Sequence, residues 1–250
     1  MNSPIVIVPT YNEADNLAAI LAGLRAASAE VHVLVVDDAS PDGTGDLADH
    51  FSRSDPRVHV LHRQGKEGLG AAYRAGFAWA LEAGYTQLVQ MDADGSHDPA
   101  DVPRLLAALD TMDVAVGSRW VPGGSAVGWP ARRLLLSRGG SAYARRVLGI
   151  GQRDVTSGFR AFRAEALHAI DVARVRSSGY CFQIEMLQRA SAAGFAIREV
   201  PIVFTDRRFG VSKMSPAIVL EAMLRVTVWG ALRVLRRRDV GAAPKVVAHV

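Results

Sequence analysis

The sequence predicts an α/β fold: a mostly parallel central sheet with helices on both faces. Short apolar runs rich in β-branched residues alternate with stretches of helical spacing, which is typical of strands and helices that take turns along a parallel sheet. The chain has 250 residues, 49% of them hydrophobic, enough to bury the core of one large domain. Pairs of aspartates directly follow two of the apolar runs, which places acidic groups at the carboxyl edge of the sheet.

The expected strands are short and buried. They cover residues 5–8, 31–36, 58–61, 88–91 and 114–116, and a last strand covers 196–204. The expected helices have apolar residues three or four positions apart. They cover residues 17–24, 71–81, 102–109, 134–148 and 182–193.

The end of the chain predicts a separate amphipathic helix. Pro216 stands at its start, and apolar side chains recur mostly on one broad face from 218 to 235. Glu221, Arg225 and Arg233 interrupt this segment, so we do not expect it to cross a membrane. The expected organisation is a main domain over 1–214, a helix over 215–238 that faces a membrane or a partner, and a flexible tail over 239–250.

Charge and cysteine content narrow the function classes. Lys and Arg outnumber Asp and Glu by 29 to 25, and most basic residues follow position 118, so we expect an anionic partner for the later half. A nucleic-acid partner is disfavoured, because the formal net charge is only +4 and the basic residues lack interleaved aromatic platforms. The single cysteine, Cys181, and an N-terminus without the features of a secretory signal indicate a cytoplasmic protein.

Asp92 and Asp94 form the clearest candidate for a metal site. They follow a predicted strand two residues apart, so both side chains point to the same side of an extended chain. Carboxylates this close repel each other unless a cation lies between them, and hard oxygen ligands suit Mg²⁺ or Mn²⁺. The alternative is an Asp-rich turn that caps the helix beginning near Pro99.

Two other loops suit a nucleotide. Asp37 and Asp38 can accept hydrogen bonds from ribose or a base, although the turn that follows at 41–43 explains them equally well. Tyr11 can stack on a base and Glu13 can accept from the base edge, or residue 12 or 13 caps the next helix. A dehydrogenase is disfavoured, because this loop lacks the Gly-rich fingerprint that a dinucleotide needs.

Taken together and in order, these motifs resemble glycosyltransferase family 2, and more narrowly the polyprenol phosphate mannosyltransferases. The likeness rests on Pro9-Thr10-Tyr11-Asn12-Glu13, Val36-Asp37-Asp38, Lys66-x-Gly68-Leu69-Gly70, Met91-Asp92-Ala93-Asp94-x-Ser96-His97 and Gly117-Ser118-Arg119. It continues through Trp129-Pro130, Arg133, residues 154–159, Glu185, residues 199–202 and Gly210-x-Ser212-Lys213. It covers nearly the whole chain up to Ser215.

The resemblance implies a GT-A fold that transfers mannose from GDP-mannose to a polyprenyl monophosphate, with inversion at the anomeric carbon. The implied donor-binding residues are Pro9, Tyr11, Glu13, Val36, Asp38, Gly68, Asp92, Ala93, Asp94 and Arg119. The implied ligands of Mg²⁺ or Mn²⁺ are Asp92, Asp94 and Ser96, and relatives can have Gln where this chain has Ser96.

The implied residues that bind the acceptor phosphate are Arg133, Ser157, Arg207 and Lys213. The implied catalytic residues are Asp94, Arg119, Arg133, Arg207 and Lys213. A phosphate monoester, with a second pKa near ~6, is already an anionic nucleophile, so no catalytic base is expected. We expect a peripheral place at the inner face of the membrane, held by the final helix, the acceptor or a separate membrane-embedded protein. Two alternatives stay open: a UDP-sugar such as UDP-glucose as donor, and a non-catalytic nucleotide or lipid-phosphate binding module.

Overall fold

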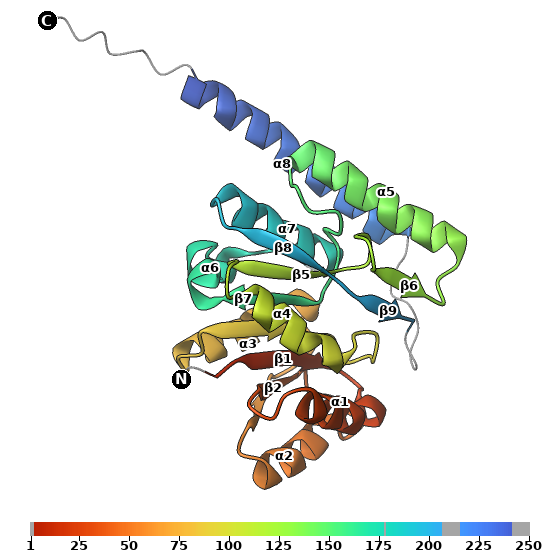
Figure 1. Cartoon of the computed structure of the whole chain (residues 1–250), viewed down its shortest axis with the longest axis vertical. Helices are drawn as coiled ribbons and strands as arrows, with labels where there is room; N and C mark the ends of the chain where they lie inside the picture. Colours follow the sequence, from red (N-terminus) through yellow and green to blue (C-terminus); the bar gives the residue numbers. More distant parts are fainter. Residues whose placement is uncertain (1–2, 178, 207–215, 242–250) are drawn as a thin grey trace, which may run out of the picture.

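The computed structural model describes residues 3–177, 179–206 and 216–241, and it is built around one large sheet (Figure 1). The strand order is β3-β2-β1-β4-β7-β5-β8. The strands are β1 (Ile5–Thr10), β2 (His32–Asp37), β3 (Val58–His62), β4 (Gln87–Gln90), β5 (Val114–Ser118), β7 (Arg160–Arg163) and β8 (Ile197–Pro201). All neighbours are parallel except β7, which runs antiparallel to β4 and β5. The prediction of a mostly parallel sheet is confirmed.

Helices cover both faces of this sheet. They are α1 (Ala14–Ala27), α2 (Thr44–Ser54), α3 (Leu69–Glu82), α4 (Val102–Ala108), α5 (Ala131–Leu148), α6 (Ala164–Ala169), α7 (Gly179–Ala192) and α8 (Pro216–Gly241), with short 3₁₀ turns at η1 (Pro99–Asp101) and η2 (Val172–Arg174). A second sheet pairs β6 (Ser125–Val127) with β9 (Val203–Thr205).

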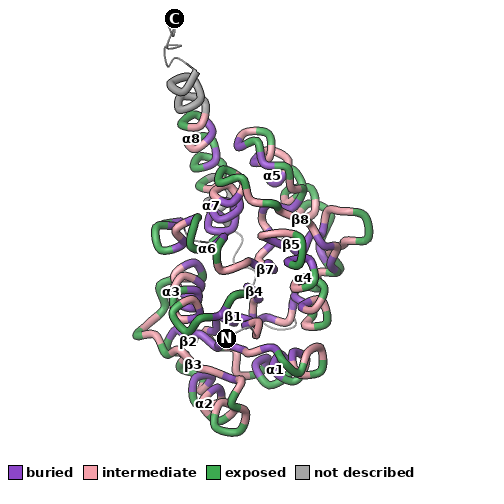
Figure 2. The backbone as a smooth tube through the Cα atoms, turned by 60° about the vertical axis from the view of Figure 1, so that its left-hand side comes forward, coloured by how far each residue is buried: buried purple, intermediate pink, exposed green. Residues whose placement is uncertain are grey.

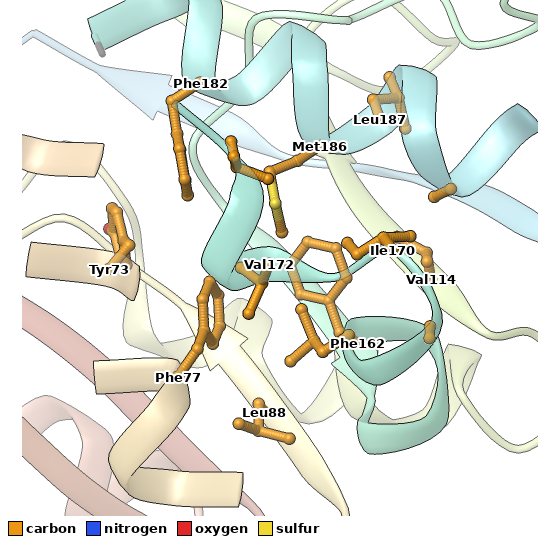
Figure 3. Close-up of a cluster of buried hydrophobic side chains, with 14 of the residues drawn as sticks. Tyr73, Phe77, Leu88, Val114, Phe162, Ile170, Val172, Phe182, Met186 and Leu187 are labelled. Carbon is orange, nitrogen blue, oxygen red and sulfur yellow. The ribbon is translucent and has the colours of Figure 1, made fainter. Parts of the chain in front are cut away.

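The alternating side chains of the strands divide the core in two. Ile5 and Ile7 of β1 point to the face covered by α3, α6 and α7, whereas Val6 and Val8 point to the face covered by α1 and α4. Figure 3 shows the first face, where Phe77 of α3 meets Phe162 of β7 edge to face, with ring centroids 5.8 Å apart. The apolar strands are therefore buried on both sides, as parallel strands usually are.

Three differences from the sequence expectations have physical causes. The strand expected over 196–204 is two strands, because the buried Ile202 donates its N–H to Ser118 O and the chain then leaves the main sheet to pair with β6. Strand β7 has no apolar run that predicts it, since Arg160 and Arg163 occupy its ends. Helix α2 has only a narrow buried face at Thr44, Gly45 and Ala48, which gives no clear apolar period.

Helix α8 lies alongside α5 (Figure 1), and the two helices run in the same direction. Tyr143 and Thr227 share a hydrogen bond of 2.6 Å between their hydroxyls, and Gly230 allows close approach because a Cβ there would lie 2.3 Å from Val147 Cγ1. The apolar face expected here is only partly buried: Val226 is 2% exposed but Leu232 is 49% exposed. Figure 2 shows exposed residues recurring along the described turns of α8.

Helix α8 overlaps the helix expected over 215–238, and residues 239–241 of the expected tail belong to it. The rest of that tail lies outside the described residues. Among the described residues, no helix is both long enough and apolar enough to span a bilayer.

Candidate active site

The carboxyl ends of β1 and β2 meet at one rim of the sheet, where Thr10 lies next to Asp37. The Thr10 hydroxyl donates to Asp37 at 2.9 Å, and the backbone N–H of Ser40 donates to the same carboxylate at 3.0 Å. Asp37 is 2% exposed, so it holds the two strand ends together. The loops that leave these strands are strained, since Asn12 and Ala39 have φ values of 60° and 56°.

Asp38 and Tyr11 extend from these strand ends toward the loop before α3. Arg63 forms an ion pair with Asp38 and a second one, 2.8 Å long, with Glu67. Burial raises the pKa of Asp38 above its usual value even though Arg63 opposes that shift. Lys66 Nζ lies 3.6 Å from the centre of the Tyr11 ring. The structure thus brings Tyr11 and Asp38 together with residues 63–67, of which Arg63 has no part in the motifs.

Gly68 follows this loop with a φ of 93°, a conformation that glycine adopts without strain, and it starts α3. Pro9 and Val36 are both buried, and the Val36 side chain is 0% exposed in the core beside Gly76. The side chain of Val36 therefore contributes to the core. Ala93 is 3% exposed between the two aspartates.

The start of α1 is capped from another loop. Asp42 accepts the N–H of Ala14 at 3.1 Å, and the Thr44 hydroxyl accepts the N–H of Glu13 at 3.0 Å. Burial would raise the pKa of Asp42, but hydrogen bonds from Thr44 and from the backbone hold it below its usual value. The side chains that cap α1 are therefore those of Asp42 and Thr44, and not that of residue 12 or 13, which the sequence offered as alternatives. The Glu13 carboxylate accepts from Asn16 Nδ2 at 2.7 Å.

Asp92 is held by one hydrogen bond to its side chain and one from its backbone. The Tyr73 hydroxyl donates to Asp92 Oδ1 at 2.7 Å, and the backbone N–H of Asp92 donates to His97 Nδ1 at 3.1 Å. Burial and the charge of Asp92 raise the pKa of Tyr73 well above its usual value, so Tyr73 stays a donor at neutral pH. His97 in turn stacks on Phe159, with ring centroids 4.8 Å apart. The acidic loop is thus anchored to both cores.

Asp94 and Ser96 form the second half of this loop. Asp94 Oδ1 accepts the backbone N–H of Ser96 at 3.1 Å and the Ser96 hydroxyl at 2.5 Å. Asp94 is 7% exposed and Ser96 is 1% exposed. Ser96 therefore orients Asp94, and its role as a metal ligand stays a prediction of the resemblance.

The donor set suits a hard cation. Asp92 and Asp94 offer carboxylate oxygens and Ser96 a hydroxyl, and among the described residues there is no group of three or more His, Cys, Asp or Glu placed to hold a metal. Mg²⁺ and Mn²⁺ are typically bound through one or two carboxylates, with the other positions left to water and substrate phosphates. The residues present fit such an ion.

Arg119 leaves the end of β5 and is largely committed to one carboxylate. Its Nε and one terminal nitrogen each donate to Asp154 at 2.7 Å, and the same terminal nitrogen donates to Thr156 at 3.0 Å. Burial alone would raise the pKa of Asp154, but the Arg119 guanidinium holds it below its usual value. Arg119 is 5% exposed, and the donor contact that the resemblance assigns to it stays a prediction.

Arg133 is the described arginine that the sequence assigns to the acceptor. Its guanidinium lies 3.9 Å from the centre of the Trp129 ring and forms a 2.9 Å ion pair with Asp206. Ser157 is 2% exposed and accepts the N–H of Phe159 at 3.4 Å. Arg207 and Lys213, the other two acceptor residues, lie outside the described residues.

Strand β9 connects the acidic loop with Arg133. Thr205 donates its N–H to Ser96 O at 3.2 Å, and the next residue, Asp206, carries the ion pair with Arg133. Phe204 adds an aromatic link, with its ring centroid 5.5 Å from that of His97 and 5.3 Å from that of Trp129. The sequence motifs do not include Phe204 or Asp206, and only the pairing of β9 with β6 places them here.

Comparison with known proteins adds close relatives. The model of "Glycosyl transferase family 2" matches residues 5–171. The chain is 55% identical over 228 residues to the polyprenol monophosphomannose synthase of Mycolicibacterium smegmatis, covering 90% of this chain and 86% of the relative. It is also 55% identical over 226 residues to the undecaprenyl-phosphate mannosyltransferase of Micrococcus luteus, covering 90% and 93%.

Solved structures share the fold at low identity. The glucosyl-3-phosphoglycerate synthase of Mycobacterium tuberculosis, solved with Mn²⁺ and UDP, superposes with a TM-score of 0.61 at 21% identity over 93% of this chain and 79% of that chain. A mannosyltransferase from Pyrobaculum calidifontis, solved with GDP-Man and Mn²⁺, gives 0.58 at 18% identity over 94% and 65%. With its sheet topology, its acidic rim and these relatives, the chain belongs to glycosyl transferase family 2.

Proposed function

We propose that the protein transfers mannose from GDP-mannose to a polyprenyl monophosphate and so makes polyprenyl phosphate mannose. One observation carries the proposal: adjacent residues of one short segment bind both the acidic loop, through Thr205 and Ser96, and the basic residue Arg133, through Asp206. An anionic donor and an anionic acceptor must approach each other in this reaction, and a cation site beside an arginine meets that need. The names of the two relatives at 55% identity support the choice of mannose and of a polyprenyl acceptor.

The residues divide the work between donor and acceptor. In this proposal, Tyr11 and Asp38 hold the nucleoside, and Asp92 and Asp94 hold the diphosphate end; the contacts of these residues at the same rim of the sheet support it. When bound at these aspartates, Mg²⁺ or Mn²⁺ stabilises the negative charge of the departing nucleoside diphosphate. Tyr73 and Ser96 keep the two carboxylates oriented by donating to them.

Arg133 orients the acceptor phosphate, with Arg207 and Lys213 as further cations in this proposal. Trp129 supports the Arg133 guanidinium from one side, at 3.9 Å from the ring centre. A phosphate monoester is already ionised at neutral pH, so the acceptor oxygen attacks without losing a proton to the protein. The site therefore works by positioning and charge, and no side chain acts as a base.

We also propose that the protein is peripheral at the inner face of the membrane. A lipid acceptor requires the enzyme to reach the membrane surface. Exposed apolar side chains on α5 and α8 support this location: Leu135 is 75% exposed, Leu224 60% and Val228 57%. In this arrangement, residues 1–214 are the catalytic domain, and α8 contacts lipid or a separate membrane-embedded protein.

The test combines purified protein, labelled GDP-mannose, Mn²⁺ and a short polyprenyl phosphate. We expect labelled mannolipid in the organic phase and none with Asp94→Ala, while Asp98→Asn, an exposed aspartate of the same loop, keeps activity. If the label stays in the aqueous phase with GDP-mannose but enters the organic phase with labelled UDP-glucose, the donor is UDP-glucose and not GDP-mannose. Nucleotide and lipid binding that persist without any turnover would instead indicate a non-catalytic module.

A further inference from the structure

A basic cavity of about 370 Å³ lies beside α5, apart from the residues of the proposed reaction. It is lined by Trp120, Arg138, Ala142, Arg145 and Arg153. Arg138, Ala142 and Arg145 are four and three positions apart on α5 and so share one face of that helix, whereas Trp120 follows β5 and Arg153 follows α5. The volume is within the range of ligand pockets in proteins.

In the part of the chain that the structure describes, the three arginines of this basic cavity form no ion pair with a carboxylate. Within residues 3–206 and the described part of α8, every ion pair involves other basic residues. Two acids in contact with this region are already engaged: Asp154 by the Arg119 guanidinium, and Glu199 by the backbone N–H groups of Arg153 and Asp154. Among the described residues, the three guanidinium groups around this cavity therefore have no carboxylate at ion-pair distance to compensate their positive charge.

Two buried N–H groups at the basic cavity also lack an acceptor. Trp120 Nε1 and Arg145 Nε are shielded from solvent, and neither has a hydrogen-bond partner among the described residues. Buried donors in folded proteins are nearly always paired, so each of these calls for an acceptor. The Arg138 guanidinium lies 4.9 Å from the centre of the Trp120 ring, which places it on the same wall. The three guanidinium groups that line the cavity therefore suit an anion rich in oxygen acceptors.

We propose that the basic cavity binds a phosphate group, held by the guanidinium groups of Arg138, Arg145 and Arg153. Phosphate offers several acceptor oxygens to the fixed fork of an arginine and carries the charge that these residues lack. The cavity does not include Arg133, which lies over the ring of Trp129, whereas the cavity is lined by Trp120; these two rings meet edge to face, with centroids 6.4 Å apart. The phosphate comes either from a dissolved anion or from the headgroup of an anionic lipid.

Binding is measured on the full chain without donor, acceptor or divalent metal, with EDTA present so that the acidic loop does not contribute. Inorganic pyrophosphate is titrated calorimetrically, and sedimentation compares vesicles of phosphatidylcholine with vesicles that also contain phosphatidylglycerol. The test variant is Arg138→Gln/Arg145→Gln/Arg153→Gln. The control, Arg53→Gln/Arg176→Gln/Arg198→Gln, removes the same charge from exposed arginines outside the cavity.

We expect the cavity variant to lose affinity about tenfold or more, because each lost charge-assisted hydrogen bond typically costs that factor, while the control changes little. A loss in the pyrophosphate titration alone assigns a dissolved anion, and a loss with phosphatidylglycerol vesicles assigns a lipid headgroup. Equal binding by the cavity variant and the control, or no binding of either probe by the unaltered chain, overturns the proposal. If the triple variant does not fold, Arg153→Gln replaces it, since Arg153 is an exposed loop residue outside α5.

Discussion

The Arg119 guanidinium donates two parallel hydrogen bonds, each 2.7 Å long, to the fully buried carboxylate of Asp154. This pair joins the end of β5 to the segment before β7. Glu199 of β8 adds to the junction, because it accepts the Ser118 hydroxyl at 2.7 Å and the N–H of Asp154 at 2.9 Å. The pair is therefore a structural joint beside the site.

Arg119→Met should reduce the free energy of unfolding by about 3–5 kcal/mol, because it leaves the carboxylate of Asp154 buried without its partner. Chemical denaturation measures this loss. Arg104→Met, which breaks an exposed ion pair with Asp101, should cost no more than about 1 kcal/mol. The double variant Arg119→Met/Asp154→Leu should recover part of the loss, and equal losses in Arg119→Met and Arg104→Met would contradict a buried joint.

Ser96→Ala should lower the affinity for Mn²⁺ in the presence of GDP by about 10- to 100-fold, since the Ser96 hydroxyl orients Asp94 through a 2.5 Å hydrogen bond. Calorimetric titration of Mn²⁺ into protein saturated with GDP measures the change. Ser54→Ala, the same substitution on the exposed end of α2, serves as the control. Unchanged Mn²⁺ affinity in Ser96→Ala would show that Asp94 needs no such support.

Stability should fall between pH 7 and pH 5 partly because of His32 and His59. Their ring nitrogens are 3.1 Å apart beside the Tyr85 hydroxyl, and burial lowers the pKa of both histidines. The charges of His59, Arg25 and Arg57 further lower the pKa of His32, and the charge of Asp55 opposes this shift.

The unfolded chain therefore takes up more protons than the folded one below pH ~6.5, so the folded state loses stability as the pH falls from there. His59→Gln should make this loss shallower in denaturation curves recorded at several pH values. His50→Gln, on the exposed face of α2, is the matched change. A loss in His59→Gln as steep as in the unaltered protein would exclude the pair as its source.

Gly76→Ala should destabilise the protein by about 1–3 kcal/mol, because a Cβ at this position would lie 2.6 Å from Ile7 Cγ2 in the packed core. Gly139→Ala should instead stabilise it by about 0.5–1 kcal/mol, because Gly139 lies in α5 with nothing within 4 Å of the added methyl group. Thermal and chemical unfolding both report the difference. The packing requires that the two Gly→Ala substitutions change the free energy of unfolding in opposite directions. A change in the same direction for both would contradict this account of the packing.

The sequence by itself determined the alternating strands and helices and the acidic ends of β2 and β4, because these features depend on local apolar period and on residue type. It also determined the family, since the motifs occur in order along the chain. It could not show that Asp42 and Thr44 cap α1, because the partners are 28 and 31 positions apart in the chain.

Only the tertiary structure decided how the basic residues are used. Apart from the family resemblance, which singles out Arg119 and Arg133, nothing in the sequence distinguishes these arginines from Arg63 or from those of the basic cavity. In the folded protein, three of these arginines form ion pairs with aspartates: Arg63 with Asp38, Arg119 with Asp154 and Arg133 with Asp206. The other three, Arg138, Arg145 and Arg153, line one cavity. The physical reason is that a charge takes its role from the groups that the fold places within a few ångströms of it, and those groups are distant in the chain.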